Sequence, residues 1–577
     1  MAGLISSLHN SSAALRVHSK GLEVTGKNLA NVNNRGYSKE RVEIGDRGQI
    51  NTGVATESMG VEAMGLRQNR DALLDKSVMR ELTTTADLEA RQKVLRSAEV
   101  ALGQFLDRTK DSTSIQNASG ASGGGISDAL TDFFNAWESV SVKPNDVGEK
   151  QLLIEKAKIL AEKINLTDKR LEGVQSDVDS QIQVDVGVVN QLLKEIAENN
   201  DAIAKAELVK PFSAVDLRDQ RQAKLEELSK YIDVNFENIT PNGLGQIVVK
   251  SSDGKELVNG KIVAGQSINA DGSVTGPFSY NTTTKKVQHD KDGKDGANVP
   301  VDISGNGKLQ AQIDSAYNNV TIARNEIASL ADQITKSVNV AYSAVAQPDT
   351  RFFSQKSFDT TTIPTLTLPP QASTPNINLA SGHNLQVGDQ IRLVNLSANE
   401  GVGLTEGKSY YIKSVSGVEV QLSETVGGPA VSITSSLSTS STFRRVGDPL
   451  VGNLAVNSDT LKTAKNAGGN GVALEIANLA NQKFDSSTDF ISGSYTTYFN
   501  KTVTTVAQQL NTTNTRLEDQ KLSEEMAVNS RDQYSGVSQD EEITDMMKFQ
   551  RSFQASARHI NVIDTLLEQV VNRLGVG

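Results

Sequence analysis

The stretch Ser538–Gly577 reads SQDEEITDMMKFQRSFQASARHINVIDTLLEQVVNRLGVG and carries apolar residues at a strict seven-residue spacing. The residues at this spacing are Met546, Phe553, Ile560, Leu567 and Leu574. An apolar repeat of seven keeps one stripe facing a partner only if two helices wrap around each other, because a straight helix drifts about 20° per heptad. Ser538 and Glu541 have the spacing of a capping box, which marks the start of a helix. The pattern therefore predicts a helix from Ser538 to Leu574 that packs along a second helix.

The amino terminus supplies a candidate for that second helix. Its large apolar residues also recur every seven positions, at Leu8, Leu15, Leu22 and Leu29. A second stripe, made of Ser11, His18 and Thr25, is weak, and each glycine in this segment costs about 1 kcal/mol of helix propensity relative to alanine. Such a segment needs packing to remain helical. We expect residues 1–35 and 536–577 to form a coiled-coil stem, although the nine stripe residues could instead form only the core of a single chain.

The composition excludes several classes of function. The chain has 577 residues, a formal net charge of −11 and no basic patch that offsets this charge, which argues against nucleic-acid binding. It has no cysteine, so disulfides, a thiol nucleophile and cysteine-ligated zinc are excluded. The start of the chain lacks the apolar core of a secretory signal peptide. No run of about 18 apolar residues is present, so we expect no membrane insertion.

Between the two ends, helical and strand patterns alternate in a nested order. After the first predicted helix, turn formers and a β-rich segment extend to about residue 70. Helical patterns then continue to about residue 230. Within them, we expect Phe133, Phe134 and Trp137 to anchor the core. Short alternating runs broken by Asn-Gly and Asp-Gly turns predict a small β domain at 231–304. A further strand-rich segment predicts an inserted β domain at 356–450.

These assignments together predict a mainly α fold with β insertions. The elongated helical-bundle domain is expected to comprise residues 36–230, 305–355 and 451–535. Because the insertions lie in the middle of the chain while its ends meet, we expect a rod with one or two outer β domains farthest from the terminal coiled-coil stem.

The sequence does not assemble the side chains of a catalytic or metal site. The five histidines lie in different predicted elements without metal-ligand spacing: His9, His18, His289, His383 and His559. In HDKDGKDG, three aspartates suggest a calcium loop, but Lys294 and Asp295 stand where an EF-hand needs an acceptor and a glycine. We therefore predict no catalytic residues, no cofactor and no metal.

Two carboxylate pairs are expected to have structural roles at helix starts. Glu541 and Glu542 lie at the predicted start of the last helix, where negative charge favours the helix dipole. Asp216 and Asp219, in DLRDQRQAKLEELSKYIDV, are interpreted as a helix-start surface in the same way.

Three stretches resemble one family, the bacterial flagellar axial proteins of the rod, the hook and the hook-associated layers. NLANVNNRGYSKERV at Asn28–Val42 is similar to the amino-terminal signature of this family, and Ser535–Gly575 is similar to its shared carboxyl-terminal helix. Within the family, SGVSQDEE and the internal stretch Asp216–Val234 resemble the hook-associated members at the hook–filament junction. The family's turn motif corresponds here to Asn31, Asn33, Gly36 and Tyr37, without the proline that is common in it.

The resemblance implies a structural adaptor that joins hook to filament by packing its terminal helices into an axial tube. It implies as partners the hook protein, a second hook–filament junction protein, other copies of the chain in a ring, and a cytoplasmic export chaperone on the carboxyl-terminal helix. It also implies an extracellular location in the flagellum, reached from the cytoplasm by the flagellar type III apparatus without a cleaved signal peptide. The stripe residues at both ends would make the subunit contacts.

Two alternatives remain at this stage. A hook or distal-rod protein would share both ends of the chain, and the internal stretch Asp216–Val234 argues against it. A secreted coiled-coil adhesin, or an enzyme carried in a β insertion, would need convergent polar groups within 232–304 or 356–450, and the sequence offers none.

Overall fold

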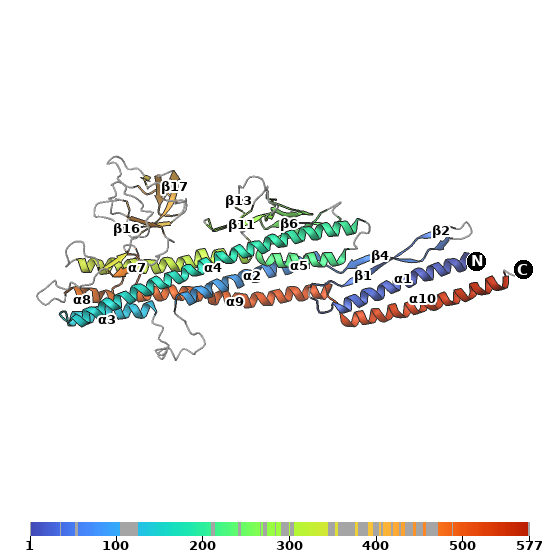
Figure 1. Cartoon of the computed structure of the whole chain (residues 1–577), viewed down its shortest axis with the longest axis horizontal. Helices are drawn as coiled ribbons and strands as arrows, with labels where there is room; N and C mark the ends of the chain where they lie inside the picture. The colour runs from blue at the N-terminus through green and yellow to red at the C-terminus, as the bar shows by residue number, and fades with distance from the viewer. Residues whose placement is uncertain are drawn as a thin grey trace. The chain divides into compact units, whose positions relative to one another are not determined.

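A computed structural model describes most of the chain (Figure 1). The chain forms two compact units. The described residues are 2–34, 36–51, 56–103, 125–208, 214–239, 244–265, 267–268, 274–282, 284–289, 299–300, 305–343, 352–355, 376–378, 390–395, 403–404, 408–416, 419–425, 428–432, 442–445, 454–456, 471–486 and 489–574. Unit 1 comprises Met1–Ala90, Ser180–Gln312 and Asn514–Gly577, and unit 2 comprises Arg91–Asp179 and Ile313–Thr513. Helices dominate and the sheets are small and antiparallel, which confirms a mainly α fold with β insertions.

Long helices contribute to unit 1 together with several small sheets. Its helices are α1 (Ala2–Ala30), α5 (Val215–Tyr231) and α10 (Gln539–Leu574), with parts of α2 (Ala72–Ala101), α4 (Val147–Glu207), α6 (Lys308–Asp314) and α9 (Tyr495–Ser535). β1 (Glu40–Asp46) pairs with β4 (Val61–Gln68), and β2 (Gln49–Asn51) pairs with β3 (Thr56–Ser58).

The predicted small β domain lies within unit 1. A four-stranded sheet runs in the order β5 (Val234–Asn238), β6 (Ile247–Ser251), β7 (Glu256–Asn259) and β8 (Ile262–Val263). β9 (Ser267–Ile268) pairs with β10 (Val274–Thr275), and a three-stranded sheet comprises β11 (Phe278–Asn281), β12 (Lys286–His289) and β13 (Val299–Pro300).

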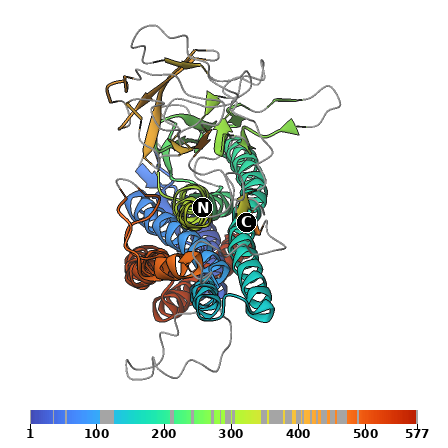
Figure 2. The same ribbon diagram turned by 90° about the vertical axis from the view of Figure 1, so that its left-hand side faces the viewer.

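Unit 2 combines helices with the second group of strands. Besides its parts of the shared helices, it contains α3 (Ile126–Val142), a π-helical turn η2 (Ser315–Val320), α7 (Thr321–Ser343), α8 (Gly471–Asn478) and a 3-10 turn η3 (Leu479–Asn481). β14 (Phe353–Gln355) pairs with β20 (Leu454–Val456). A five-stranded sheet, drawn in yellow to orange in Figure 2, has the order β15 (Asn376–Asn378), β18 (Glu419–Ser423), β17 (Ser409–Ser416), β16 (Gln390–Asn395) and β19 (Thr442–Arg445).

The core of unit 2 contains an aromatic cluster and a buried ion pair. Phe133 and Trp137 on α3 are fully buried, as predicted, and pack against Phe352 and Phe353. On another side of the unit, the guanidinium of Arg324 donates to both carboxylate oxygens of Asp168 at 2.9 and 3.2 Å. Buried charges need such partners because they have lost their hydration.

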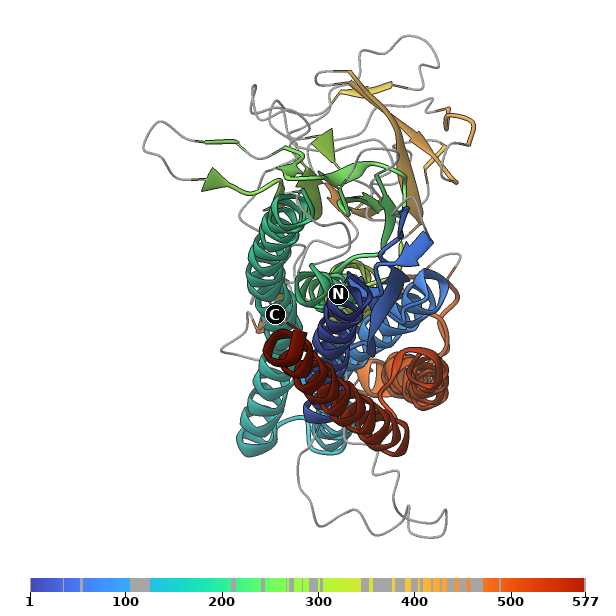
Figure 3. The same ribbon diagram turned by 90° about the vertical axis from the view of Figure 1, so that its right-hand side faces the viewer.

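The two ends of the chain meet within unit 1. α1 and α10 run antiparallel along each other, in dark blue and dark red in Figure 3, and contact each other extensively. β1 and β4 also contact α1. The predicted stem segments and the β segment 231–304 all fall in unit 1, the β segment 356–450 falls in unit 2, and the predicted helical domain contributes to both units.

The buried ion pair of unit 2 gives a first prediction. Asp168→Asn leaves the Arg324 charge buried without its counter-ion, so we expect unit 2 to lose about 3–5 kcal/mol of unfolding free energy. Trp137 is the only tryptophan of the chain and is fully buried in unit 2, so its fluorescence during urea unfolding reports on this unit.

Asp177→Asn on the same helix is the matched control, because Asp177 is exposed. We expect this control to change the unfolding free energy by no more than about 0.5 kcal/mol. Equal urea midpoints for the two variants would show that the Arg324–Asp168 pair contributes nothing to the stability of unit 2.

Candidate functional site

The α1–α10 pair is held by small and polar side chains of α1. A Cβ atom at Gly21 would lie 2.6 Å from ring carbons of Phe549, so only glycine allows the two helices this approach. The ring of His18 lies 6.3 Å from that of Phe549, and burial lowers the pKa of His18, which favours the neutral imidazole. Ser11 Oγ lies 2.7 Å from His559 Nδ1. The stripe that looked weak in sequence therefore contacts α10 through Ser11 and His18.

The apolar stripe residues predicted from the heptads are half-buried. This holds for Leu8, Leu15, Leu22 and Leu29 on α1, and for Met546, Phe553, Ile560 and Leu567 on α10. Leu574 ends α10, and its side chain lies outside the described residues. The fully buried apolar residues of the pair are Ala13, Val17, Val24 and Ile563. The structure brings the two helices together and leaves the stripe residues partly open to further contacts.

The family turn motif caps α1 and turns the chain into β1. Asn31 Nδ2 donates to Lys27 O at 3.0 Å, while Asn33 is exposed. The Gly36 amide donates to the side chain of Asn34 at 3.3 Å. Burial, together with nearby carboxylates, raises the pKa of Tyr37, so its hydroxyl stays protonated and available as a donor.

The Asn28 amide is the centre of a buried polar cluster, which we call the polar junction. Its Nδ2 donates to Glu40 O and to Glu542 Oε2, both at 2.9 Å. Its Oδ1 accepts from Tyr37 Oη at 2.7 Å and from Glu40 N at 3.0 Å. The two donors and two acceptor positions of this amide are therefore all used. The other members of the polar junction are Lys27, Lys39, Asp216 and Glu541.

Lys39 links the start of α10 to β1. Its Nζ lies 2.8 Å from Glu541 Oε2 and 3.0 Å from Glu542 Oε1. Burial lowers the pKa of Lys39, but its hydrogen bonds to both glutamates outweigh burial and raise it above the ordinary value. The interpretation of these glutamates as helix-dipole residues was incomplete, because Glu542 is only 1% exposed and bonded to Asn28. The Glu541 carboxylate is likewise bonded to Lys39, rather than closing a capping box with Ser538.

The start of α5 completes the cluster. Lys27 Nζ lies 2.6 Å from both Glu40 Oε1 and Asp216 Oδ1. Burial raises the pKa of the Glu40 carboxyl, and the contact with Lys27 opposes this only in part. Asp219 is buried, contrary to the predicted surface role, and its Oδ1 lies 3.2 Å from Arg70 Nη2. Burial raises the pKa of Asp219 to about 6, although the charge of Arg70 acts in the opposite direction.

The three stretches that resemble the flagellar axial family thus meet at one place. The first provides Asn28, Tyr37 and Glu40, the internal stretch provides Asp216, and SGVSQDEE provides Glu542. The turn between α9 and α10 is tied to the same place, because Lys39 N donates to Ser535 O at 2.8 Å and Asn69 Nδ2 donates to Tyr534 O at 2.5 Å. No local pattern in the sequence could reveal this convergence of three distant segments.

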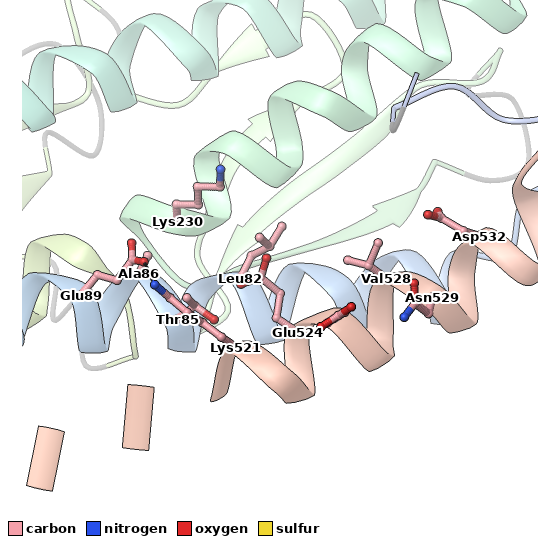
Figure 4. Close-up of a pocket in the computed structure, with 11 residues that line it drawn as sticks. Leu82, Thr85, Ala86, Glu89, Lys230, Lys521, Glu524, Val528, Asn529 and Asp532 are labelled. Atoms are coloured by element: carbon pink, nitrogen blue, oxygen red, sulfur yellow. Dashed lines mark ion pairs between the residues drawn. The ribbon is translucent and has the colours of Figure 1, made fainter. Parts of the chain in front are cut away.

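A cleft of about 530 Å³ lies elsewhere in unit 1, between α2 and α9 (Figure 4). Its charged lining includes Glu89 and Lys521, which are 3.0 Å apart, and Lys230 at the end of α5. None of its lining residues is a histidine, cysteine or serine, and the Thr85 hydroxyl donates to its own helix at Glu81 O. The cleft therefore lacks the Ser–His or Cys–His pair of a nucleophilic hydrolase.

The described part of the chain holds neither a candidate metal cluster nor a helix that could span a membrane. There, no group of three or more His, Cys, Asp or Glu residues is placed to hold a metal ion. None of the described helices is long and apolar enough to cross a membrane. The HDKDGKDG stretch, whose calcium interpretation was rejected, has its three aspartates outside the described residues.

Comparisons with known proteins relate the chain to one group. Residues 112–345 match the family described as "Flagellar hook-associated protein FlgK helical domain", and residues 530–574 match "Flagellar basal body rod FlgEFG protein C-terminal". Flagellar hook-associated protein 1 of Bacillus subtilis (strain 168) is 22% identical over 606 residues, covering 100% of both chains. The protein of the same name in Escherichia coli (strain K12) is 21% identical over 341 residues, covering 58% of this chain and 57% of the relative.

A solved structure shares the fold. The flagellar hook junction protein FlgK from Burkholderia pseudomallei aligns with a TM-score of 0.53 at 12% sequence identity. The alignment covers 79% of this chain and 99% of that chain.

The close approach at Gly21 gives a prediction for the helix pair. Gly21→Ala improves helix propensity by about 1 kcal/mol, but its methyl group collides with the Phe549 ring, so we expect weaker pairing of α1 with α10. The chain has no cysteine, so Ser11→Cys with His559→Cys introduces a unique thiol pair whose crosslinking by a short bifunctional reagent measures the pairing.

Gly26→Ala is the matched control, because a Cβ there has no neighbour within 4 Å. This control keeps the gain in helix propensity without the collision, and we expect it to crosslink as fast as the parent. If Gly21→Ala crosslinked equally fast, Phe549 would not hold the helices at their observed separation.

The central amide gives a prediction for the polar junction. Asn28→Asp keeps the shape of the side chain but places carboxylate oxygens against Glu542 and Glu40 O, where two N–H donors stood. We expect a cost of about 3 kcal/mol, which makes amide hydrogen exchange in the first turn of α10 about a hundredfold faster. Asn33→Asp adds the same charge at an exposed position in the adjacent turn and should leave exchange unchanged. Equal amide hydrogen-exchange rates in the two variants would show that the Asn28 side chain does not stabilise the start of α10.

Proposed function

We propose that this chain, which belongs to the flagellar hook-associated proteins, is a non-enzymatic structural adaptor that joins the flagellar hook to the filament. The full-length relationship to hook-associated protein 1 supports this function. The match of residues 112–345 to the helical domain of hook-associated proteins favours it over a hook or distal-rod protein. We place the working location of the chain in the extracellular flagellum.

The observation that carries the assembly mechanism is the open apolar side of α10. Ile543, Met547, Val562 and Leu566 are exposed, and Val562 is 57% exposed. An amphipathic helix with this much uncovered apolar surface favours association, since covering that surface releases water. The half-buried stripe residues of α1 and α10 would be covered by the same contacts. We infer that neighbouring copies pack against this side of the terminal pair.

The partners follow from this geometry and from the family. Copies of the chain would form a ring-like layer in the axial tube, with the hook protein on one side and a second hook–filament junction protein on the other. A cytoplasmic chaperone would cover the apolar side of α10 before export, because an exposed apolar stripe favours aggregation. Export would proceed through the flagellar type III apparatus without cleavage of a signal peptide.

The test is to mix the purified chain with isolated hooks and image the hook ends by electron cryomicroscopy. We expect one finite layer that stops growing and shows the terminal helices in the tube. Growth of long tubes would instead identify the chain as a hook or rod protein. Absence of binding would leave α1 and α10 with a role inside a single chain only.

A pair of variants tests the apolar side of α10 directly. Val562→Asp places a charge on the exposed apolar side without disturbing a buried contact, and we expect at least about tenfold less chain on hook ends. Asn33→Asp adds the same charge at an exposed position in the turn after α1, away from α10, and should assemble normally. Circular dichroism and Trp137 fluorescence check that both variants fold. Normal incorporation of Val562→Asp would exclude this surface from the assembly contact.

A further inference from the structure

A second cavity in unit 1, of about 250 Å³, is lined by four arginines. It lies among the end of β4, the starts of α2 and α5, and the strands β5 and β6. The four are Arg67, Arg70, Arg218 and Arg221, and the lining contains one carboxylate, that of Asp75. This concentration of positive charge stands out on a chain with a net charge of −11.

Two of these arginines have carboxylate partners. Arg218 donates to both oxygens of Glu207 at 3.0 and 2.9 Å, which is a bidentate ion pair. Arg70 lies 3.2 Å from Asp219 and 3.6 Å from Asp75. The charges of Arg70 and Arg218 are therefore balanced by groups of the protein.

Arg221 differs from these two. It is only 6% exposed, and its Nη1 donates to Asn200 Oδ1 and to Gly245 O, both at 2.8 Å and both neutral. Among the described residues, no carboxylate lies within ion-pair distance of it. Burial, with the charges of Arg218 and Arg70, lowers the pKa of Arg221 to about 9, and the charge of the Glu207 carboxylate opposes this only in part. A buried guanidinium without a counter-ion is costly, because the charge has lost its hydration.

Arg67 adds an unbalanced charge at the open side of the cavity. It is exposed, and it stands directly opposite Arg41 in the register of β4 and β1. Like charges at opposed positions of an antiparallel pair destabilise the sheet. Neither arginine has an ion pair with any described residue. The cavity therefore combines one buried and one exposed arginine that form no ion pair with a carboxylate of the described residues.

We propose that this cavity binds a small inorganic oxyanion, phosphate or sulfate, between Arg67 and Arg221. The N–H groups of a guanidinium match the oxygens of such an anion in geometry and charge, and two uncompensated arginines match a dianion. A volume of about 250 Å³ holds several waters at about 30 Å³ each, so a tetrahedral oxyanion fits. This site does not depend on the assembly function proposed above.

The test is calorimetric titration of the full chain with sodium phosphate at constant ionic strength, followed by sulfate, and by acetate and chloride as reference anions. We expect saturable binding of phosphate or sulfate at one site per chain. The phosphate-saturated chain should also unfold at a higher temperature, because a ligand that binds only the folded state stabilises it.

Arg67→Gln is the diagnostic variant, since an exposed arginine without a described partner can be replaced without damage to the fold. Removing one charge-assisted contact should weaken phosphate binding about tenfold or more. Arg47→Gln is the matched control, because it removes one positive charge from the β1–β2 turn, away from the cavity lining, and should bind phosphate like the parent.

Three results would overturn the proposal. One is the absence of saturable heat with phosphate and sulfate beyond that of chloride. Another is equal affinity of Arg67→Gln and Arg47→Gln, which would mean that any binding reflects general positive charge and not this cavity. Stronger binding of acetate than of either inorganic anion would also contradict it, because the site would then recognise carboxylates.

Discussion

The side-chain amide of Asn28 makes four hydrogen bonds that connect α1, β1 and α10. The arrangement around it requires that every buried polar group has a hydrogen-bond or ion-pair partner. Glu542 and Glu40 are each 1% exposed, and their carboxylates would strongly destabilise the fold without such partners. Lys27 and Lys39 supply the matching charges from either side. Since buried charges tolerate little displacement, the cluster fixes where α10 begins relative to the end of α1. The polar junction therefore also sets the direction in which α10 runs along α1.

Beyond the polar junction, the terminal pair gains little from large apolar side chains. Gly21 lets the Phe549 ring approach the α1 backbone, and the leucines of α1 remain half-buried. A helix that contains glycines has low intrinsic stability, so packing against neighbouring elements keeps it helical. One neighbour, α10, is present in the same chain, and the apolar side of α10 that α1 leaves exposed is the surface proposed above for contacts with further copies.

Several parts of this structure could be predicted from the sequence, because they follow from local periodicity. The heptads of Ser538–Leu574 predicted α10 and the need for a partner helix, and the anchors Phe133 and Trp137 proved to be buried. The contact face of α1 could not be predicted from its large residues alone, because small residues also make the contact: Ser11 lies against His559 and Gly21 against Phe549. The burial of Asp219 and Glu542 could not be predicted because their partners are distant in sequence. Asp219 pairs with Arg70, well over a hundred positions away, and Glu542 bonds to Asn28, hundreds of positions away.

The arginine cavity and the polar junction are adjacent at the start of α5, because Val215 lines the cavity and Asp216 belongs to the polar junction. Arg70 lines the cavity while it pairs with Asp219, whose Oδ2 accepts from Ser38 N next to the turn motif. Gln68, another lining residue, donates to Val215 O at the start of α5. Two charges about 4 Å apart interact by about 4 kcal/mol at an effective dielectric constant of 20, so a charge in the cavity acts on the Arg70–Asp219 pair. An anion held there would reduce the repulsion among the arginines and would compete with Asp219 for Arg70. The start of α5 is therefore the element through which occupation of the cavity would reach the polar junction.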